Sequence, residues 1–175
     1  MAAITTLWVR THGYVPINLL ARIFDGEVVK IAVLQGPNLN RLGKRRPDKY
    51  GRKTLADITA ELEVLADKLG VEVVQTQSNH EGGLIDWLHE VQDEIDGILI
   101  NPAGLTPYGR SLYDSLKDAE LPIAIVHMSA IFQFEKQAHP DMYADLASIY
   151  IAGLKSDGYG VALEHLVEFL RNKES

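Results

Sequence analysis

The sequence predicts an α/β domain built on an open, doubly wound sheet of five parallel strands, with helices on both faces. Three observations predict it. Short apolar runs alternate along the chain with amphipathic segments of helical length, as in repeated strand–helix–strand units. The runs are apolar throughout, as in strands that helices cover on both sides. The 175 residues are enough for one domain with its own core, and no cysteine is present to staple a smaller one.

The first strand is expected at 29–34, where the run "VKIAVL" precedes a turn at Gly36. A helix follows from Thr54 to Leu69. Thr54 can cap its first turn, leucine and isoleucine recur on one of its faces, and Gly70 suits the position that closes a helix.

The middle of the chain repeats this alternation. A second strand is expected at 71–77, and apolar side chains at helical spacing predict a helix at 84–95. The segment "GILINPAG" (97–104) predicts a third strand that runs into a turn. A short helix is expected at 109–119.

The last third supplies two more strands and a helix. The run "LPIAIVHMS" predicts a buried fourth strand that ends at His127, and "ASIYIAGL" at 147–154 predicts the fifth. Amphipathic spacing predicts a final helix at 160–171. We interpret "GLKSDGYG" as the loop before this helix.

Residues 29–175 are expected to form a single domain, and residues 1–28 an N-terminal extension that packs on it or on a neighbouring subunit. The extension lacks the basic start, apolar centre and cleavage site of a signal peptide. No apolar run approaches the roughly 20 residues that a membrane-spanning helix requires. Together with the absence of cysteine, these features favour the cytoplasm.

The net charge of −7 argues against bulk binding of nucleic acid, which requires a positive surface. Basic residues concentrate in 41–53, so a small anion would bind there. No phosphate-binding loop, GxSxG motif or dinucleotide fingerprint after a strand is present. His80, His89 and His139 lack the carboxylate spacing of a metal site, so we expect no metal and no cofactor.

Polar side chains suited to proton transfer follow several predicted strands. In an open parallel sheet, ligands bind beyond the carboxyl ends of the strands. The loops at those ends contain Asn38, Arg45, Tyr50, Asn101, His127 and Ser129. A free tyrosine ionises near pH 10, so a tyrosinate base at neutral pH needs positive charge within about 4–6 Å. Arg45 would supply that charge to Tyr50. His127 would then act as the general acid, and Asn38 would hold a water or an enolate oxygen.

Each of these residues also has a simpler interpretation. A loop tyrosine near arginines is usually a stacking contact, and a histidine that ends a strand is more often structural than catalytic. The segments "NPN" and "NPAG" can be turns alone. The residues by themselves leave both interpretations open.

Four motifs favour the catalytic interpretation. "QGPNLNRLGKRRPDKYG", "QSNHEGGLIDWLHE", "INPAGLT" and "VHMS" occur in an order and spacing that resemble the type II 3-dehydroquinate dehydratases over about residues 29–171. The resemblance implies a flavodoxin-like fold, trimers that usually assemble into dodecamers, and no cofactor. It also implies reversible anti elimination of water from 3-dehydroquinate through an enolate, on a biosynthetic or a catabolic pathway.

The resemblance implies a role for each matching residue. Tyr50 matches the family's base, Arg45 the arginine that favours its ionised form, and Asn38 the asparagine that positions a water at the enolate. His127 matches the acid that protonates the leaving C1 hydroxyl.

Four further positions match residues that contact the substrate. Asn101 matches a contact to the leaving hydroxyl, and Met128 with Ser129 match the turn that grips the carboxylate. Asp114 matches an acid that reaches into the site of a neighbouring subunit. Its carboxylate has no evident partner within its own helix, which supports a homo-oligomer.

The chain departs from the family pattern around the substrate. The family has a histidine, a glutamate, an asparagine and two arginines where this chain has Pro107, Ile125, Ala130, Phe134 and Ala138. The missing histidine and the later arginine bind the C4 and C5 hydroxyls in the family. Two buried hydroxyls without partners would weaken dehydroquinate binding by roughly 2–6 kcal/mol. The glutamate that becomes Ile125 is also an orienter of His127.

These departures leave three hypotheses. The chain is a dehydratase of 3-dehydroquinate, or a paralogue that dehydrates a related, less hydroxylated cyclic substrate. The third hypothesis, of another class, is a non-catalytic protein that binds ring acids. The altered pocket would explain such a protein, but the joint retention of the four matched proton-transfer residues argues against it.

Overall fold

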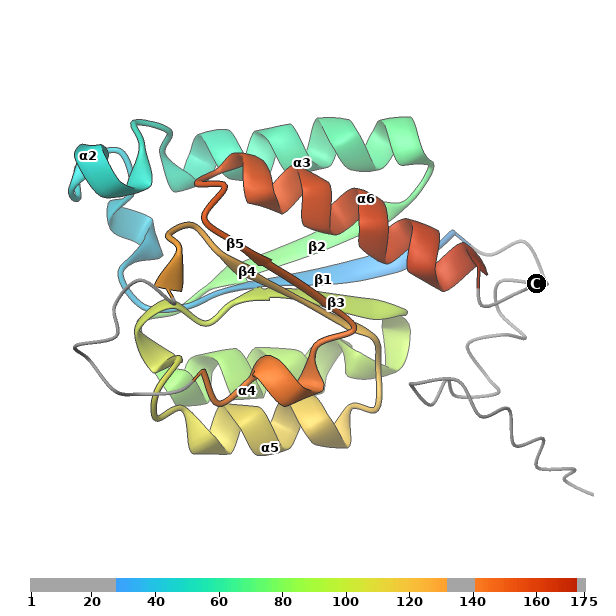
Figure 1. The fold of residues 1–175 in the computed structure, drawn as a ribbon. Helices are drawn as coiled ribbons and strands as arrows, with labels where there is room; N and C mark the ends of the chain where they lie inside the picture. The colour runs from blue at the N-terminus through green and yellow to red at the C-terminus, as the bar shows by residue number, and fades with distance from the viewer. Residues whose placement is uncertain (1–27, 132–140, 173–175) are drawn as a thin grey trace, which may run out of the picture.

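The computed structural model describes residues 28–131 and 141–172, which form three layers with a parallel sheet in the middle (Figure 1). The five strands lie in the order β2-β1-β3-β4-β5. Their bounds are β1 Lys30–Gln35, β2 Glu72–Gln77, β3 Gly97–Asn101, β4 Ile123–His127 and β5 Ile149–Ala152. All four pairings are parallel. The predicted flavodoxin-like sheet is confirmed, whereas the expected extension at 1–28 lies, apart from Val28, outside the described residues.

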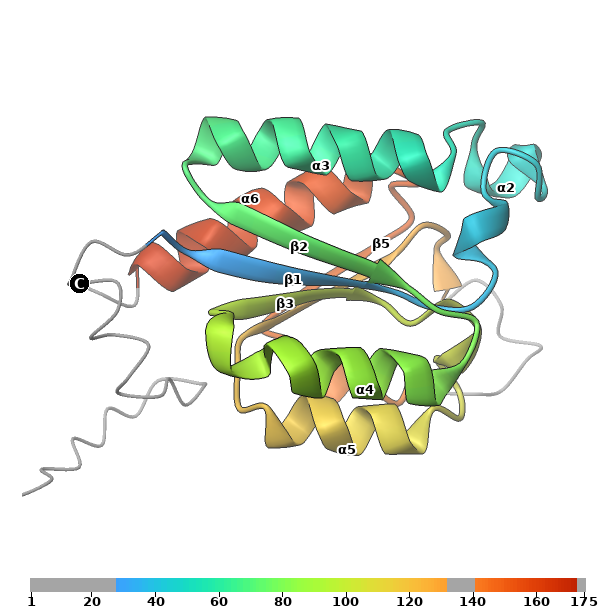
Figure 2. The same cartoon turned by 180° about the vertical axis from the view of Figure 1, so that it is seen from behind.

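Two helices cover each face of the sheet (Figure 1 and Figure 2). α3 (Leu55–Leu69) and α6 (Asp157–Asn172) pack on one face, and α4 (Glu81–Val91) and α5 (Arg110–Asp118) on the other. A single helical turn, α2 (Pro47–Tyr50), lies beyond the carboxyl ends of the strands. The short 3-10 helices are η1 Leu39–Arg41, η2 Gln92–Glu94, η3 Ala103–Leu105 and η5 Ala144–Leu146. Within the described residues, no helix is both long and apolar enough to span a membrane.

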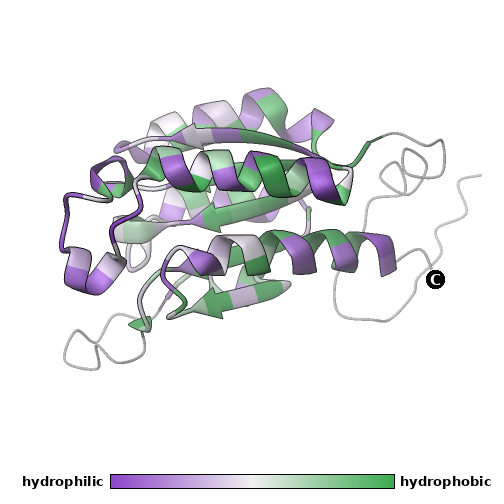
Figure 3. Ribbon diagram, turned by 90° about the horizontal axis from the view of Figure 1, so that it is seen from above, coloured by the Kyte–Doolittle hydropathy of each residue, from purple (hydrophilic) through white to green (hydrophobic). Residues whose placement is uncertain are grey.

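The sheet divides the hydrophobic core into two halves. Successive side chains of a strand point to opposite faces. Ile31 and Val33 of β1 therefore pack with α3 and α6, while Ala32 and Leu34 pack with α4 and α5. All four are fully buried. Figure 3 shows the strands mainly in the hydrophobic colour and the loop around α2 in the hydrophilic one. The basic residues of the loop around α2 thus lie at the edge of the sheet at which the strands end.

The start of α3 confirms the predicted cap. The Thr54 hydroxyl accepts a hydrogen bond from the Asp57 backbone N–H at 3.1 Å, and the Asp57 carboxylate accepts one from the Thr54 backbone N–H at 2.8 Å. These reciprocal bonds satisfy two backbone donors that a helix start leaves free. Gly70 adopts the left-handed conformation after the last turn. Both ends of this helix could therefore be predicted.

The start of α6 corrects the interpretation of "GLKSDGYG" as a loop. The helix begins at Asp157, three residues before the expected start at 160. Its first-turn glycine, Gly158, lies against the sheet, where a Cβ atom would stand 3.2 Å from Ile151 Cγ2 and 3.5 Å from Val126 Cγ1. The glycine that indicated a loop instead allows close packing of a helix on a strand.

Candidate active site

The ends of β1, β3 and β4 bring two predicted site residues, Asn101 and His127, to one edge of the sheet, beside Gln35. Gln35 at the end of β1 pairs with Asn101 at the end of β3, and His127 ends the neighbouring β4. Gly36 follows directly, and its N–H donates to the Asn101 carbonyl at 2.9 Å. A side chain at Gly36 would collide with the Pro102 carbonyl. A glycine is therefore required at this position, where the loop after β1 meets the loop after β3.

Asn38 lies in the loop after β1, with a backbone φ of 68°. Its N–H donates to Asn79 Oδ1 at 2.8 Å, and Gln77 Nε2 donates to the same oxygen at 3.1 Å. Residues 77–79 end β2 and begin the next loop, so the second strand fixes the backbone of Asn38. Its side chain is exposed, which leaves the amide available to a ligand.

Two cations lie over the ring of Tyr50, and the structure thus brings Arg45 and Tyr50, the predicted pair, together. Arg45 Cζ lies 5.4 Å from the centroid of the Tyr50 ring, and Lys49 Nζ lies 5.3 Å from it. Arg46, in a left-handed conformation, turns the chain into α2 and so places Arg45 and Tyr50 on either side of the turn. Both cations stand over the ring, which is the stacking contact of the simpler interpretation. The role of Tyr50 as a base stays a prediction.

His127 is buried in a hydrogen-bonded cluster, and its partner was not predicted. His127 Nε2 lies 2.7 Å from Asp141 Oδ2, with side-chain exposures of 5% and 2%. The Tyr150 hydroxyl donates to the same oxygen at 2.7 Å, and the Tyr143 backbone N–H donates to Asp141 Oδ1 at 3.0 Å. The rings of His127 and Tyr150 are 5.5 Å apart, centroid to centroid. A strand-end histidine is thus paired with a buried carboxylate.

The electrostatics of this cluster favour an ionised Asp141. Burial alone would raise the pKa of its carboxyl group, but the three hydrogen bonds that it accepts outweigh that cost, so the pKa lies below its ordinary value. Burial and the bond to Asp141 raise the pKa of Tyr150 well above the range of free tyrosine. The Tyr150 hydroxyl therefore stays protonated and donates a hydrogen bond to the carboxylate.

Asp141 gives His127 a carboxylate partner, although Ile125 replaces the glutamate of the family pattern. Ile125 lies two residues before His127 on β4 and is fully buried in the core on the α4 and α5 side. A carboxylate reaches the histidine from another segment, 14 residues further along the chain. The sequence offered one general reason to expect such a partner, because a buried histidine needs a hydrogen-bond acceptor for its ring N–H. It did not indicate which residue this would be.

Asn101 is engaged in a second buried cluster. Its Nδ2 donates to the Tyr159 hydroxyl at 2.7 Å, that hydroxyl donates to Gln35 Oε1 at 2.7 Å, and the Ala103 N–H donates to Asn101 Oδ1 at 3.1 Å. Burial raises the pKa of Tyr159, so its hydroxyl stays protonated. This network joins β1, β3 and α6 beneath the site. Contact of Asn101 with a leaving hydroxyl stays a prediction.

Met128 and Ser129 follow β4 directly, as expected. Met128 is buried and Ser129 partly exposed. The His127 carbonyl accepts the Gly153 N–H at 3.1 Å, and the Met128 carbonyl accepts the Lys155 N–H at 2.9 Å. The loop after β5 thus fixes the turn that the sequence assigned to carboxylate binding.

Asp114 lies on the exposed surface of α5, and one expectation about it was wrong. Its carboxylate has a partner on its own helix, because Arg110 Nη2 lies 3.1 Å from it. The role of Asp114 towards a neighbouring subunit stays a prediction. Of the positions that depart from the family pattern, Phe134 and Ala138 lie outside the described residues. Ala130 is described and packs against Gly153.

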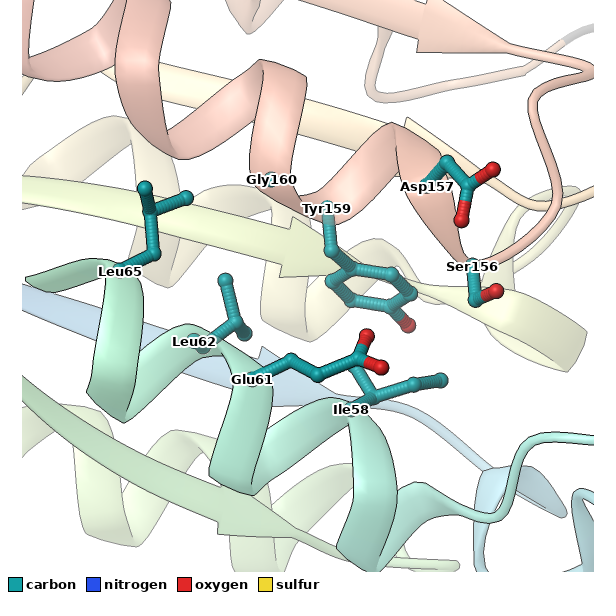
Figure 4. Close-up of a pocket in the computed structure, with 8 residues that line it drawn as sticks. All are labelled: Ile58, Glu61, Leu62, Leu65, Ser156, Asp157, Tyr159 and Gly160. Carbon is teal, nitrogen blue, oxygen red and sulfur yellow. The ribbon is translucent and has the colours of Figure 1, made fainter.

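A cavity of about 110 Å³ lies elsewhere, between α3 and α6 (Figure 4). Its lining is Ile58, Glu61, Leu62, Leu65, Ser156, Asp157, Tyr159 and Gly160. Lys53 Nζ lies 2.7 Å from Glu61 and 3.6 Å from Asp157, which ties the two helices together beside it. The cavity therefore includes none of the predicted site residues. Within residues 28–131 and 141–172, no three His, Asp or Glu side chains gather to hold a metal ion.

Comparison with known proteins gives a consistent result. The family model of class II dehydroquinase matches residues 29–167. A 3-dehydroquinate dehydratase of Halothermothrix orenii is 44% identical over 142 residues, covering 81% of this chain and 96% of that protein. One from Bacillus subtilis is 39% identical, covering 77% and 91%. The crystal structure of type II dehydroquinase from Propionibacterium acnes superposes with a TM-score of 0.75 at 35% identity, covering 79% of this chain and 96% of that one.

Proposed function

Because the chain belongs to the class II dehydroquinase family, we propose that it dehydrates 3-dehydroquinate to 3-dehydroshikimate. The similar proteins of Halothermothrix orenii and Bacillus subtilis are named 3-dehydroquinate dehydratases. Family membership makes the chain a hydro-lyase with a small-molecule substrate. The hypothesis of a non-catalytic ring-acid-binding protein is therefore set aside. The observation that carries the proposal is the pairing of a buried histidine with a carboxylate at the sheet edge where Asn38 and Tyr50 also lie.

The reaction begins at the base. The Tyr50 phenolate removes a proton from the carbon beside the ketone, and the electrons of the broken C–H bond form an enolate. The positive charges of Arg45 and Lys49 lie over this ring and would offset the negative charge of a phenolate. The exposed amide of Asn38 holds a water that hydrogen-bonds to the enolate oxygen.

The reaction ends at the acid. The enolate electrons return to re-form the ketone, the double bond moves, and the C1–O bond breaks. His127 delivers a proton to the departing oxygen, which leaves as water. Solvent then takes the proton from Tyr50 and returns one to His127. The turn at Met128 and Ser129 holds the substrate carboxylate, and Asn101 contacts the leaving hydroxyl.

A second candidate function follows from Pro107, which stands in the loop that would face the far hydroxyls of the substrate. A related ring with fewer hydroxyls would lose less by the absence of a histidine there. The loss of the glutamate at position 125 no longer favours this alternative, because Asp141 supplies a carboxylate to His127. The choice between the two substrates depends on the contacts to the C4 and C5 hydroxyls alone.

Absorbance of the conjugated enone product, formed from 3-dehydroquinate by the purified protein, tests the proposal. We expect turnover comparable to that of an ordinary family member. Turnover below about 1% of that value, with faster dehydration of a less hydroxylated ring, would establish the paralogue instead. Tyr50→Phe should abolish elimination of either substrate, because phenylalanine cannot accept a proton. Retained activity in this variant would exclude the proposed base.

We also propose a trimer as the assembly unit, with dodecamers built from it. The support is the family resemblance, in which Asp114 matches an acid that reaches into a neighbouring site; Asp114 is exposed on α5 but pairs with Arg110. Sedimentation velocity should give a mass that is a multiple of three chains. Asp114→Ala should lower activity, whereas Asp118→Ala, also exposed on α5, should not. A fully active monomer would contradict this assembly.

A further inference from the structure

We propose that Asp141 is the residue that positions His127, and that Tyr150 holds Asp141 in place. The inference rests on the proposed dehydratase function, because His127 is its acid. It goes beyond the family pattern, in which a glutamate at the position of Ile125 has this task. The carboxylate has thus moved from the strand that bears the histidine to a segment that follows it.

The geometry at the histidine supports the pairing. The distance from His127 Nε2 to Asp141 Oδ2 is 2.7 Å, in the range of a hydrogen bond to an ionised acceptor. Both side chains are almost completely buried, so water does not compete for either. An ionised carboxylate only accepts hydrogen bonds. Nε2 must therefore carry a hydrogen.

The pairing assigns the other ring nitrogen to catalysis. In the neutral ring, one nitrogen donates and the other accepts. With Nε2 fixed as the donor to Asp141, Nδ1 is the atom that exchanges a proton with the substrate. The hydrogen bond to Asp141 engages Nε2 and not Nδ1. Asp141 therefore determines which atom of the ring acts, as well as the direction in which the ring points.

Asp141 is itself held from three sides. Tyr150, on β5, donates to the same oxygen as His127, and the Tyr143 N–H donates to the other oxygen. A carboxylate with both oxygens bonded cannot rotate away without breaking one of these bonds. Tyr150 is thus the residue that fixes the plane of the carboxylate.

The segment that carries Asp141 is anchored to the loop after β3. The Met142 N–H donates to the Thr106 carbonyl at 3.2 Å, and the Tyr143 hydroxyl donates to the Gly109 carbonyl at 2.8 Å. Pro107 lies between these two carbonyls. The loop in which the family histidine is replaced is therefore the loop that positions the new carboxylate.

The position of Ile125 shows why the carboxylate comes from elsewhere. Side chains two residues apart on a strand share a face, so residue 125 is the natural neighbour of His127 within β4. In this chain, that position is fully buried among apolar side chains of the core. A carboxylate there would be buried among these apolar side chains with His127 as its neighbour, whereas Asp141 accepts three hydrogen bonds.

The first test measures the histidine directly, without substrate. Nitrogen-15 NMR of the His127 ring in the wild-type chain should show hydrogen on Nε2 and a free Nδ1 in the neutral ring. Asp141→Asn should change this pattern to a mixture of tautomers. Asp145→Asn is the matched control, because Asp145 lies in the same segment but bonds to Tyr113. Hydrogen on Nδ1 in the neutral wild-type ring would overturn the proposal.

The second test separates the acid step from the base step. In D₂O, Tyr50 and solvent should exchange deuterium into the carbon beside the ketone, and enone absorbance measures elimination. Asp141→Asn should lower kcat for elimination by roughly 10- to 100-fold while exchange continues, so the ratio of exchange to elimination rises. Tyr150→Phe should give a smaller change in the same direction, and Asp145→Asn should give none.

The outcomes distinguish this inference from the proposed function. A wild-type chain that neither exchanges nor eliminates would overturn the proposed function, and with it the assignment of Asp141 to the acid. A wild-type chain that turns over 3-dehydroquinate, with Asp141→Asn eliminating at the same rate, would leave the function intact and overturn this inference alone. Loss of exchange and elimination together in a folded Asp141→Asn variant would also overturn it, because the role would then not be specific to the acid.

Discussion

Tyr50 and His127, the two residues assigned to proton transfer, are held by opposite kinds of contact. Tyr50 is half-buried in a basic loop, with the charges of Arg45 and Lys49 against its ring. His127 is buried, and a hydrogen bond fixes its ring to Asp141. Cations therefore lie against the residue proposed as the base, whereas a buried carboxylate holds the ring of the residue proposed as the acid. Substitutions beside Tyr50 and substitutions beside His127 should therefore have different effects on the reaction.

Removal of one cation beside the proposed base should slow the reaction. Arg45→Gln should lower kcat/KM at neutral pH by about tenfold or more, because the guanidinium charge lies over the ring on which negative charge is proposed to reside. The measurement is kcat/KM at pH 7.

Arg46→Gln is the control for this variant. Arg46 is an exposed neighbour in the same loop, so the change in net charge is the same. An equal loss of kcat/KM in both variants would show that general charge, and not the contact of Arg45 with the ring, supports the reaction.

At the scale of elements, the strands and most helices could be predicted because their signals are local. Apolar runs and the cap at Thr54 act within a few residues. The start of α6 was misplaced because Gly158 serves a contact with β5 that no local pattern reveals. Asp141 was missed for a similar reason. Its partners lie on β4 and β5, and only the folded chain brings them together.

The cap of α3 should contribute to stability and not to catalysis. Thr54→Ala removes the acceptor for the Asp57 N–H, so the free energy of unfolding should fall by about 0.5–2 kcal/mol. Urea unfolding measures this loss. Thr59→Ala, inside the same helix, should change stability by only a few tenths of a kcal/mol. The loop that contains α2 ends directly before this cap. A measurement of kcat for Thr54→Ala therefore reports whether the helix start also positions the proposed base. An unchanged kcat is the expected result.

At the scale of the whole molecule, the site joins segments that the sheet order brings together. The network of Asn101, Tyr159 and Gln35 ties β3 to α6 and β1. The cluster around Asp141 ties the end of β4 to β5 and, through Tyr143, to the loop after β3. Groups that are proposed to support the reaction therefore also connect the layers of the fold. A change in their charge should affect the stability of the entire domain.

The free energy of unfolding should depend on pH through Asp141. Its folded pKa lies below the ordinary value of 3.8, so the unfolded chain takes up a proton at a higher pH than the folded chain does. The stabilisation is therefore fully present above about pH 4 to 5 and is lost as the pH falls through the folded pKa. Asparagine does not titrate. Asp141→Asn should be less stable than the wild type at pH 7, and the difference should narrow towards pH 3.

Urea unfolding of both chains between pH 7 and pH 2.5 measures this difference. Other carboxylates contribute to acid unfolding in both chains, and they cancel when one curve is subtracted from the other. Asp145→Asn reports the effect of one lost negative charge in the same segment. If the difference between the wild type and Asp141→Asn were the same at pH 7 and at pH 3, the carboxylate would not be ionised by its three donors, and its hold on His127 would be that of a neutral group.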